Sequence, residues 1–384
     1  MYHKLGKIPS KRHTVFRSDK GNLYFEELFG NEGFSGDSSL MYHIHRPTQI
    51  KDIKGEVDKT PEVAVHENVT SRKFKNGLLE CKSDYKDSKE PLLVNDDLII
   101  GTASVGRSRQ DYFYKNASGD ELIFIHKGTG VLKTFFGNIL FRDGDYLLIP
   151  KGVIYQIDFS TASNKIFYID AKSKISFPKR YLSSKGQFLE HSPICERDIR
   201  LPSELITIDQ AGEFTVIINK NNFQHEVIYA HHPFDVVGWD GYCYPFAISI
   251  HDFEPITGSI HQPPTVHQIF EGKNFVVCSF CPRLFDYHSD AIPAPYHHSN
   301  IDSDEVLYYV EGNFMSRDNI ECGDITLHPA GIPHGPHPGT IEASIGEKST
   351  DELAVMVDPF NPFKLTVKAV EIEDANYFKS WLNK

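Results

Sequence analysis

The chain has 384 residues, of which 40% are hydrophobic, so it is long enough to bury a substantial core. Its formal net charge of -12 at pH 7, with no separate block of lysine and arginine, excludes a general nucleic-acid binder. Neither an apolar leader nor a membrane-length apolar stretch occurs, so we expect a cytoplasmic protein that does not enter a membrane. An anionic substrate would need a locally positive site, and a bound metal is its simplest source.

The predicted elements are mostly short strands. Residues 21–30 (GNLYFEELFG) show a helical period, so we expect a helix there. Segments rich in Val, Ile, Phe and Tyr and bounded by Gly or Pro follow at 120–128, 130–137, 145–152 and 306–312. Residues 373–384 (EDANYFKSWLNK) are the second helix candidate. The sequence therefore predicts an all-β fold with minor helix.

A faint long-range repeat divides the chain. The second half carries the string Glu305, Gly312, Gly323, Pro329, Gly331 and His334. The first half repeats its spacing, except between the two Gly-led segments, with Glu121, Gly128, Gly144, Pro150, Gly152 and Tyr155. Each string is typical of two hairpins and a Pro-x-Gly corner that fold into one small barrel. We therefore expect two related domains, residues 1–200 and residues 201–384.

The second string predicts a metal centre at the mouth of its barrel. His298 lies upstream on an extended segment, so His298, Glu305 and His334 can converge on one point. Two imidazoles and one carboxylate form the facial triad of non-haem Fe(II) oxygenases, which leaves positions free for substrate and O2. Asn300 stands where a fourth ligand could lie, and we expect His328 beside the ligands rather than among them.

The matching positions of the first half predict a different role. They carry Tyr114, Glu121 and Tyr155. A phenol is protonated at neutral pH and is a poor ligand for a divalent metal. We therefore expect a first barrel that holds no metal, packs on the second barrel and shapes its entrance.

Several longer motifs resemble those of one family. They are LYFEELFG, MYHIHRPT, HHPFDVVGWDGYCYPF, PAPYHHSN, IPHGPHPGTIEASIG and DELAVMVDPFNPF. Over nearly the whole chain, these segments are similar to homogentisate 1,2-dioxygenase, particularly its shorter bacterial form. The resemblance implies a bicupin, with two double-stranded β-helix (jelly-roll) barrels of which the N-terminal one is degenerate.

The resemblance also implies roles for single residues. The iron ligands of the family fall on His298, Glu305 and His334, and His334 also contacts the substrate. The active-site base falls on His261, with His267 as a nearby competitor for that role. A substrate-contacting Tyr of the family falls on Phe314, which leaves the exact phenol open.

The resemblance implies a reaction and an assembly. The chain would open the ring of homogentisate with Fe(II) and O2 to give 4-maleylacetoacetate, in tyrosine and phenylalanine breakdown, and would form a homo-oligomer, which is a hexamer in the family. A related cupin dioxygenase acting on another phenol acid, such as gentisate, would keep the same ligands and change the pocket. A non-catalytic bicupin that binds a small molecule is the alternative from another class, and the intact triad argues against it.

Overall fold

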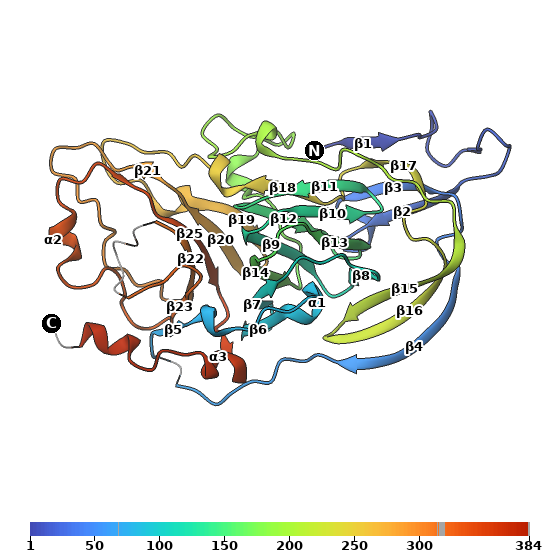
Figure 1. The fold of residues 1–384 in the computed structure, drawn as a ribbon. Coiled ribbons are helices and arrows are strands. Elements are labelled where there is room, and N and C mark those ends of the chain that lie inside the picture. Colours follow the sequence, from blue (N-terminus) through green and yellow to red (C-terminus); the bar gives the residue numbers. More distant parts are fainter. Residues whose placement is uncertain (68, 313, 315–318, 383–384) are drawn as a thin grey trace.

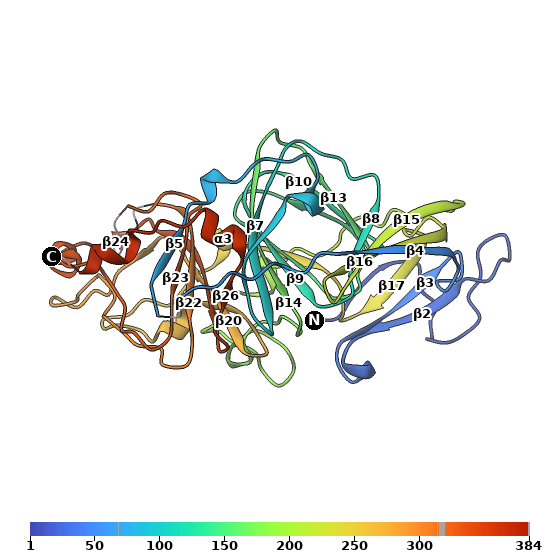
Figure 2. The same cartoon turned by 90° about the horizontal axis from the view of Figure 1, so that it is seen from below.

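Strands form most of the regular structure, as the short Gly- and Pro-bounded segments predict (Figure 1). The computed structural model describes residues 1–67, 69–312, 314 and 319–382. Figures 1 and 2 show an elongated molecule, with the C-terminal half at one end and the N-terminal strands at the other. The all-β bicupin prediction is confirmed.

A sheet at the N-terminal end has the strand order β1-β17-β3-β2. Its strands are β1 (His3–Gly6), β17 (Val236–Gly241), β3 (Ser38–His43) and β2 (Phe25–Gly30). The helix predicted for residues 21–30 is wrong, because β2 occupies most of that segment. β2 pairs along its whole length with β3, and Phe29 packs its ring on Phe135 and Phe136. These tertiary contacts override the weak helical period of the segment.

The first barrel is built from a pair of large sheets. One has the order β11 (Gly137–Phe141), β10 (Gly130–Thr134), β13 (Tyr155–Phe159), β8 (Phe113–Asn116), β15 (Ala211–Lys220), β16 (Phe223–His231) and β4 (Ile50–Asp58). The other has the order β18 (Phe246–Ser249), β12 (Asp145–Ile149), β9 (Asp120–Lys127), β14 (Asn164–Ala171), β7 (Leu98–Val105), β6 (Lys89–Val94) and β26 (Lys364–Leu365). Completely buried side chains such as Ile123, Leu132 and Leu147 form the core of this barrel.

The second barrel is smaller. Its main sheet has the order β19 (Gln268–Gly272), β20 (Phe275–Phe280), β25 (Leu353–Pro359), β22 (Glu305–Glu311), β23 (Ile325–His328) and β5 (Arg72–Phe74). A short separate pair joins β21 (Arg283–Leu284) to β24 (Ser349–Thr350). β22 lies between β23 and β25, so both its edges are hydrogen-bonded.

The halves exchange strands. β5, from the N-terminal half, pairs with β23, and β26, from the C-terminal half, pairs with β6. Figures 1 and 2 both show the blue β5 beside the orange β23. Strands β15 to β18, at residues 211–249, join the sheets of the N-terminal half. These pairings favour a boundary near residue 250, and the division into residues 1–200 and 201–384 stays a prediction.

Helices are short throughout the described residues. The α-helices are α1 (Tyr85–Ser88), α2 (Thr340–Ser344) and α3 (Val367–Glu371). The 3-10 turns are η1 (Glu32–Phe34), η2 (Asn76–Leu78), η3 (Lys179–Tyr181), η4 (Glu196–Asp198), η5 (Ile250–Asp252), η6 (Pro264–His267) and η7 (Tyr377–Trp381). Of the helix predicted for residues 373–384, the described residues form only the 3-10 turn η7. In the part of the chain that the structure describes, no helix has the length and apolar character to cross a bilayer.

A buried cluster joins the two barrels. The ring of Phe167, on β14, stacks on Tyr308, on β22, with 4.7 Å between centroids. Burial lowers the pKa of His126 to about 4, and the Tyr308 hydroxyl donates to Nδ1 of this neutral imidazole at 2.6 Å. Because β22 begins with Glu305, this packing also fixes a candidate metal ligand.

Candidate metal centre

Glu305 is the first residue of β22, and contacts of the residue before it fix its position. The preceding residue, Asp304, is buried and accepts the backbone N–H groups of Ala330 and Phe363 at 2.9 and 2.8 Å. These bonds tie the start of the strand to the two segments that flank it. Glu305 then lies opposite His328 in the pairing of β22 with β23.

His298 and His334 meet through their backbones. The N–H of each residue donates to the carbonyl of the other at 2.9 Å, which forms an isolated bridge. Gly335 lies beside this bridge with a φ of +156°, and a Cβ there would come within 2.7 Å of Nδ1 of His297. A side chain at residue 335 would therefore disturb the close approach of the segments that carry the two imidazoles.

The structure brings the three predicted ligands together. Nε2 of His298 lies 3.3 Å from Oε2 of Glu305, and Nε2 of His334 lies 3.5 Å from the same oxygen. One donor atom from each of the three residues lies within 4.8 Å of the other two. Side chains up to 36 residues apart along the chain thus form one compact N, N, O set. Their role as ligands stays a prediction.

The second oxygen of Glu305 contacts His328. Nδ1 of His328 donates to Oε1 of Glu305 at 2.9 Å, and the hydroxyl of Tyr377 donates to Nε2 of His328 at 3.2 Å. The His328 ring is completely buried and stacks on His334. His328 therefore lies beside the donor set and orients its carboxylate, as the sequence indicates.

The charge of Glu305 suits a cation. Burial opposes its ionisation, but hydrogen bonds from His298, His328 and His334 outweigh burial and hold the pKa of this carboxyl well below its usual value. Nε2 of His334 is buried and, apart from its long 3.5 Å contact with Oε2 of Glu305, makes no hydrogen bond to a described residue. A buried nitrogen with so weak a partner is costly unless a ligand satisfies it. The residues present therefore fit a divalent metal ion.

A cavity of about 440 Å³ adjoins the donor set. Its apolar lining includes Phe280, Phe285, Pro295, Tyr296, Leu307 and Met356. His298, Glu305 and Asn300 also line it, so Asn300 lies near the set as the sequence predicts. Arg283 lines the same cavity and forms no ion pair with a described residue. An aromatic anion would find both an apolar wall and a guanidinium here.

The two candidate bases both line this cavity. Nδ1 of His261 lies 3.3 Å from Oδ2 of Asp286, a contact that orients the half-exposed imidazole. His267 is more enclosed, and burial, aided by Arg283, lowers its pKa to about 3. Because a base must accept a proton near neutral pH, the lowered pKa of His267 argues against that role for it. The role of His261 stays a prediction.

Phe314 lies behind the cavity wall. It belongs to a small apolar cluster with Leu307, Tyr309 and Met356, and its ring centroid is 4.8 Å from that of Tyr309. Leu307 and Met356 line the cavity, whereas Phe314 is not among the described lining residues. Contact of Phe314 with a substrate stays a prediction.

The matching place in the first barrel holds an ammonium group. Tyr114, Glu121 and Tyr155 do converge, because Tyr155 pairs with Tyr114 and donates to Glu121 at 3.1 Å. Nζ of Lys89 lies 3.2 Å from Oε1 of Glu121 and 2.8 Å from both carboxylate oxygens of Asp170. A fixed cation thus neutralises the buried carboxylates of this barrel.

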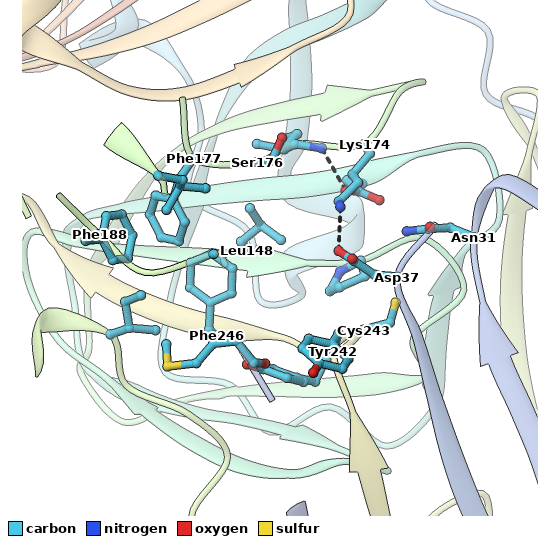
Figure 3. A pocket seen from close by; sticks show the side chains of 18 residues that line it. Asn31, Asp37, Leu148, Lys174, Ser176, Phe177, Phe188, Tyr242, Cys243 and Phe246 are labelled. Atoms are coloured by element: carbon cyan, nitrogen blue, oxygen red, sulfur yellow. Dashed lines mark hydrogen bonds and ion pairs between the residues drawn. The ribbon is translucent and has the colours of Figure 1, made fainter. Parts of the chain in front are cut away.

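A second cavity, of about 260 Å³, lies on the N-terminal half (Figure 3). Figure 3 shows the rings of Phe177, Phe188 and Phe246 on one side and the ion pair between Lys174 and Asp37 on the other. Its lysine and aspartate thus already neutralise each other inside the protein. This arrangement offers less to a reacting ligand than the cavity that Glu305 lines.

Sequence reasoning missed three residues near these sites. Lys89 and Asp170 are far from Glu121 along the chain, so no local signal placed them together. Asp358 lines the metal-centre cavity at the end of β25. A signal for it existed in the sequence, because Asp358 directly follows the apolar run LAVMV. Strand alternation places it on the same face as Met356.

The comparisons with known proteins identify the family of the chain. A family model described as homogentisate 1,2-dioxygenase N-terminal matches residues 70–250. A protein of Saccharolobus solfataricus named "Putative dioxygenase SSO1533" is 43% identical over 382 residues, which cover 99% of this chain and 98% of that protein.

Solved cupin structures are more distant. A cupin 2 conserved barrel domain protein from Leptotrichia buccalis has a TM-score of 0.32 and 11% identity, over 79% of this chain and 99% of that one. Protein Ylba from E. coli has a TM-score of 0.33 and 8% identity, over 78% of this chain and 95% of that one. The fold, the site and the full-length relative define a cupin-type dioxygenase. The chain belongs to the homogentisate 1,2-dioxygenase-like family.

Proposed function

We propose that the protein is an Fe(II)-dependent, extradiol-type dioxygenase that opens the ring of homogentisate with O2 to give 4-maleylacetoacetate. The observation that carries this proposal is the donor set of the half-buried His298 and the buried Glu305 and His334, which adjoins the 440 Å³ cavity. Nε2 of His334 is a buried imidazole nitrogen whose contact with Oε2 of Glu305 is long, at 3.5 Å. Two imidazoles and one carboxylate suit Fe(II) and leave positions free for a substrate and O2.

Each residue has a defined task in this proposal. His298, Glu305 and His334 would hold the iron, which when bound supplies positive charge for the phenolate and electronic contact with O2. His261, oriented by Asp286, would accept the proton of a substrate hydroxyl. The apolar walls would exclude water from the reacting ring.

The substrate class follows from the cavity. Arg283 supplies a guanidinium beside the apolar wall of the cavity, which suits the carboxylate of an aromatic acid. A gentisate-like acid would use the same ligands, and a non-catalytic binding role would use the same cavity. Homogentisate is favoured because the family model that matches residues 70–250 carries that activity in its description. A homo-oligomeric assembly is part of the same proposal.

The test is anaerobic reconstitution with Fe(II), followed by O2 consumption with homogentisate, gentisate and other dihydroxyphenyl acids. We expect one O2 consumed per homogentisate and a lower kcat/KM for the other acids. Fastest turnover of gentisate would assign the rival substrate. Iron-loaded protein that consumes no O2 with any of these phenols would support the non-catalytic alternative.

A further inference from the structure

Asp358 faces the same cavity as the candidate metal ligands. Val306 of β22 lies opposite Val357 of β25, so the antiparallel register places Glu305 opposite Asp358. Both carboxylates line the cavity. Oδ1 of Asp358 is buried and makes no hydrogen bond within the described residues.

The first barrel contains the same pair of positions. There, Glu121 of β9 lies opposite Asp170 of β14 in the register. Asp170 is satisfied, because Nζ of Lys89 donates to both of its oxygens at 2.8 Å. The lysine also lies over the ring of Tyr168, 4.2 Å from its centroid. One protein side chain therefore supplies the hydrogen-bond donor for this aspartate.

The second barrel has no such donor on the matching strand. Lys89 lies opposite Ala103 in the β6–β7 hairpin, two residues before Pro91, which lies opposite Gly101. In the matching β19–β20 hairpin of the second barrel, Gln268 lies opposite Cys278. Gln268 therefore corresponds to Pro91 of the first barrel. Counting back two residues gives Val266, whose short apolar side chain cannot donate a hydrogen bond. The cavity occupies the space beside Asp358 instead.

We propose that Asp358 is a specificity-determining residue whose Oδ1 accepts a hydrogen bond from a ring hydroxyl of the bound substrate. This inference rests on the proposed function and names how that site selects its phenol. A buried acceptor without a partner is costly, and a ligand that supplies a donor removes the cost. The substrate carboxylate lies toward Arg283, the guanidinium that lines the same cavity.

The ligands that test this inference differ by one hydroxyl. Homogentisate is 2,5-dihydroxyphenylacetate, and 2-hydroxyphenylacetate lacks the 5-hydroxyl, which is the group that this inference places at Asp358. Both are titrated anaerobically into the Fe(II)-loaded enzyme by calorimetry. For the natural chain we expect the dihydroxy acid to bind about 10–100-fold more tightly, because the other ligand leaves a buried acceptor without a partner.

Variants at Asp358 assign that preference. Asp358→Leu removes the acceptor and abolishes the preference, while the affinity for 2-hydroxyphenylacetate changes little. Asp358→Asn keeps an acceptor oxygen and most of the preference. Met356→Leu, a matched change on the same face of β25, shifts both affinities alike. Iron content and thermal unfolding are measured on each variant, to identify any that fail to fold or to bind iron. If Asp358→Leu fails, the preference of Asp358→Asn for the dihydroxy acid carries the test.

The outcomes are separable. A preference that survives in Asp358→Leu, or an equal loss of affinity for both ligands, overturns the role of Asp358. A natural enzyme that consumes no O2 with homogentisate overturns the proposed function, and this inference with it. Turnover of homogentisate by the natural enzyme together with an unchanged preference in Asp358→Leu overturns the inference alone.

Discussion

At the scale of single residues, the two carboxylate oxygens of Glu305 have different partners. Its Oε2 faces the imidazoles of His298 and His334, and its Oε1 accepts from the buried His328. The carboxylate is therefore held in one orientation before a metal arrives. A preorganised ligand loses little side-chain freedom on binding, which favours affinity.

Replacing a candidate ligand should separate metal binding from folding. We expect His334→Ala to weaken iron binding by more than about 100-fold, since even the loss of an outer partner costs 10–100-fold. The strands should remain, because their pairing and apolar core do not include the imidazole. Iron content and far-UV circular dichroism check this, with exposed His191→Ala as the control. Gross unfolding of His334→Ala would contradict the expectation.

The candidate base should affect turnover and not metal. We expect His261→Ala to keep its iron and to lose about 100- to 10,000-fold in kcat, the usual contribution of a positioned acid or base. Stopped-flow or electrode measurement of O2 uptake checks this, with His267→Ala as the competing variant. Full turnover in His261→Ala and a large loss in His267→Ala would transfer the role to His267.

At the scale of elements, the strands hold charged groups in fixed positions. β6, β9 and β14 bring together Lys89, Glu121 and Asp170 inside the first barrel. Burial raises the pKa of Glu121 to about 7, opposed mainly by Lys89, and Lys89 itself keeps a pKa well above its usual value despite its burial. The lysine is therefore the counter-charge on which this barrel depends.

Removing that counter-charge should destabilise the protein. We expect Lys89→Met to lower the free energy of unfolding by about 3–5 kcal/mol, because it leaves the buried Glu121 and the partly buried Asp170 without a cation. Urea unfolding checks this. The control Lys368→Met removes an exposed pair with Glu371 and should change stability by less than about 1 kcal/mol. Equal losses of unfolding free energy in the two variants would contradict a special contribution of the buried Lys89.

His43, on β3, should make stability depend on pH. Burial opposes its protonation, but Asp235 and Glu27 outweigh burial and raise its pKa to about 9. A folded-state pKa above the usual value of 6.5 adds stability that is full below pH 6.5 and is lost as pH rises through 9. We expect His43→Gln to flatten the fall in unfolding free energy between these values. An identical pH profile in both proteins would contradict this role.

At the scale of the whole molecule, the barrels share one core and exchange strands. β5 crosses into the second barrel, β26 returns to the first, and Phe167 stacks on Tyr308 between them. The halves are therefore coupled both through backbone pairing and through side-chain packing. The metal centre is attached to this coupled core through β22.

The coupling predicts one cooperative unfolding transition. We expect Phe167→Ala to lower the free energy of unfolding by about 3–5 kcal/mol, as for a large core side chain, and to shift the transition of both barrels together. Differential scanning calorimetry checks this, and exposed Phe360→Ala is the control. Two separate transitions, of which only one moves, would contradict the coupling.

The amino-acid sequence by itself determined the local features. The spacing from Glu305 through Gly323 and Pro329 to His334 predicted the hairpins, the corner and the donor set, because turn residues and strand alternation act over short distances. The repeat of this spacing from Glu121 to Tyr155 predicted a second, altered barrel for the same reason.

Only the tertiary structure decided which distant strands pair. The segment at Phe25 became a strand because β3 offered it an edge, although its own period favoured a helix. Lys89 met Asp170, and Asp358 came to face the cavity, through the order of strands in each sheet. Strand order depends on burying apolar faces of the whole chain at once, so no local pattern encodes it.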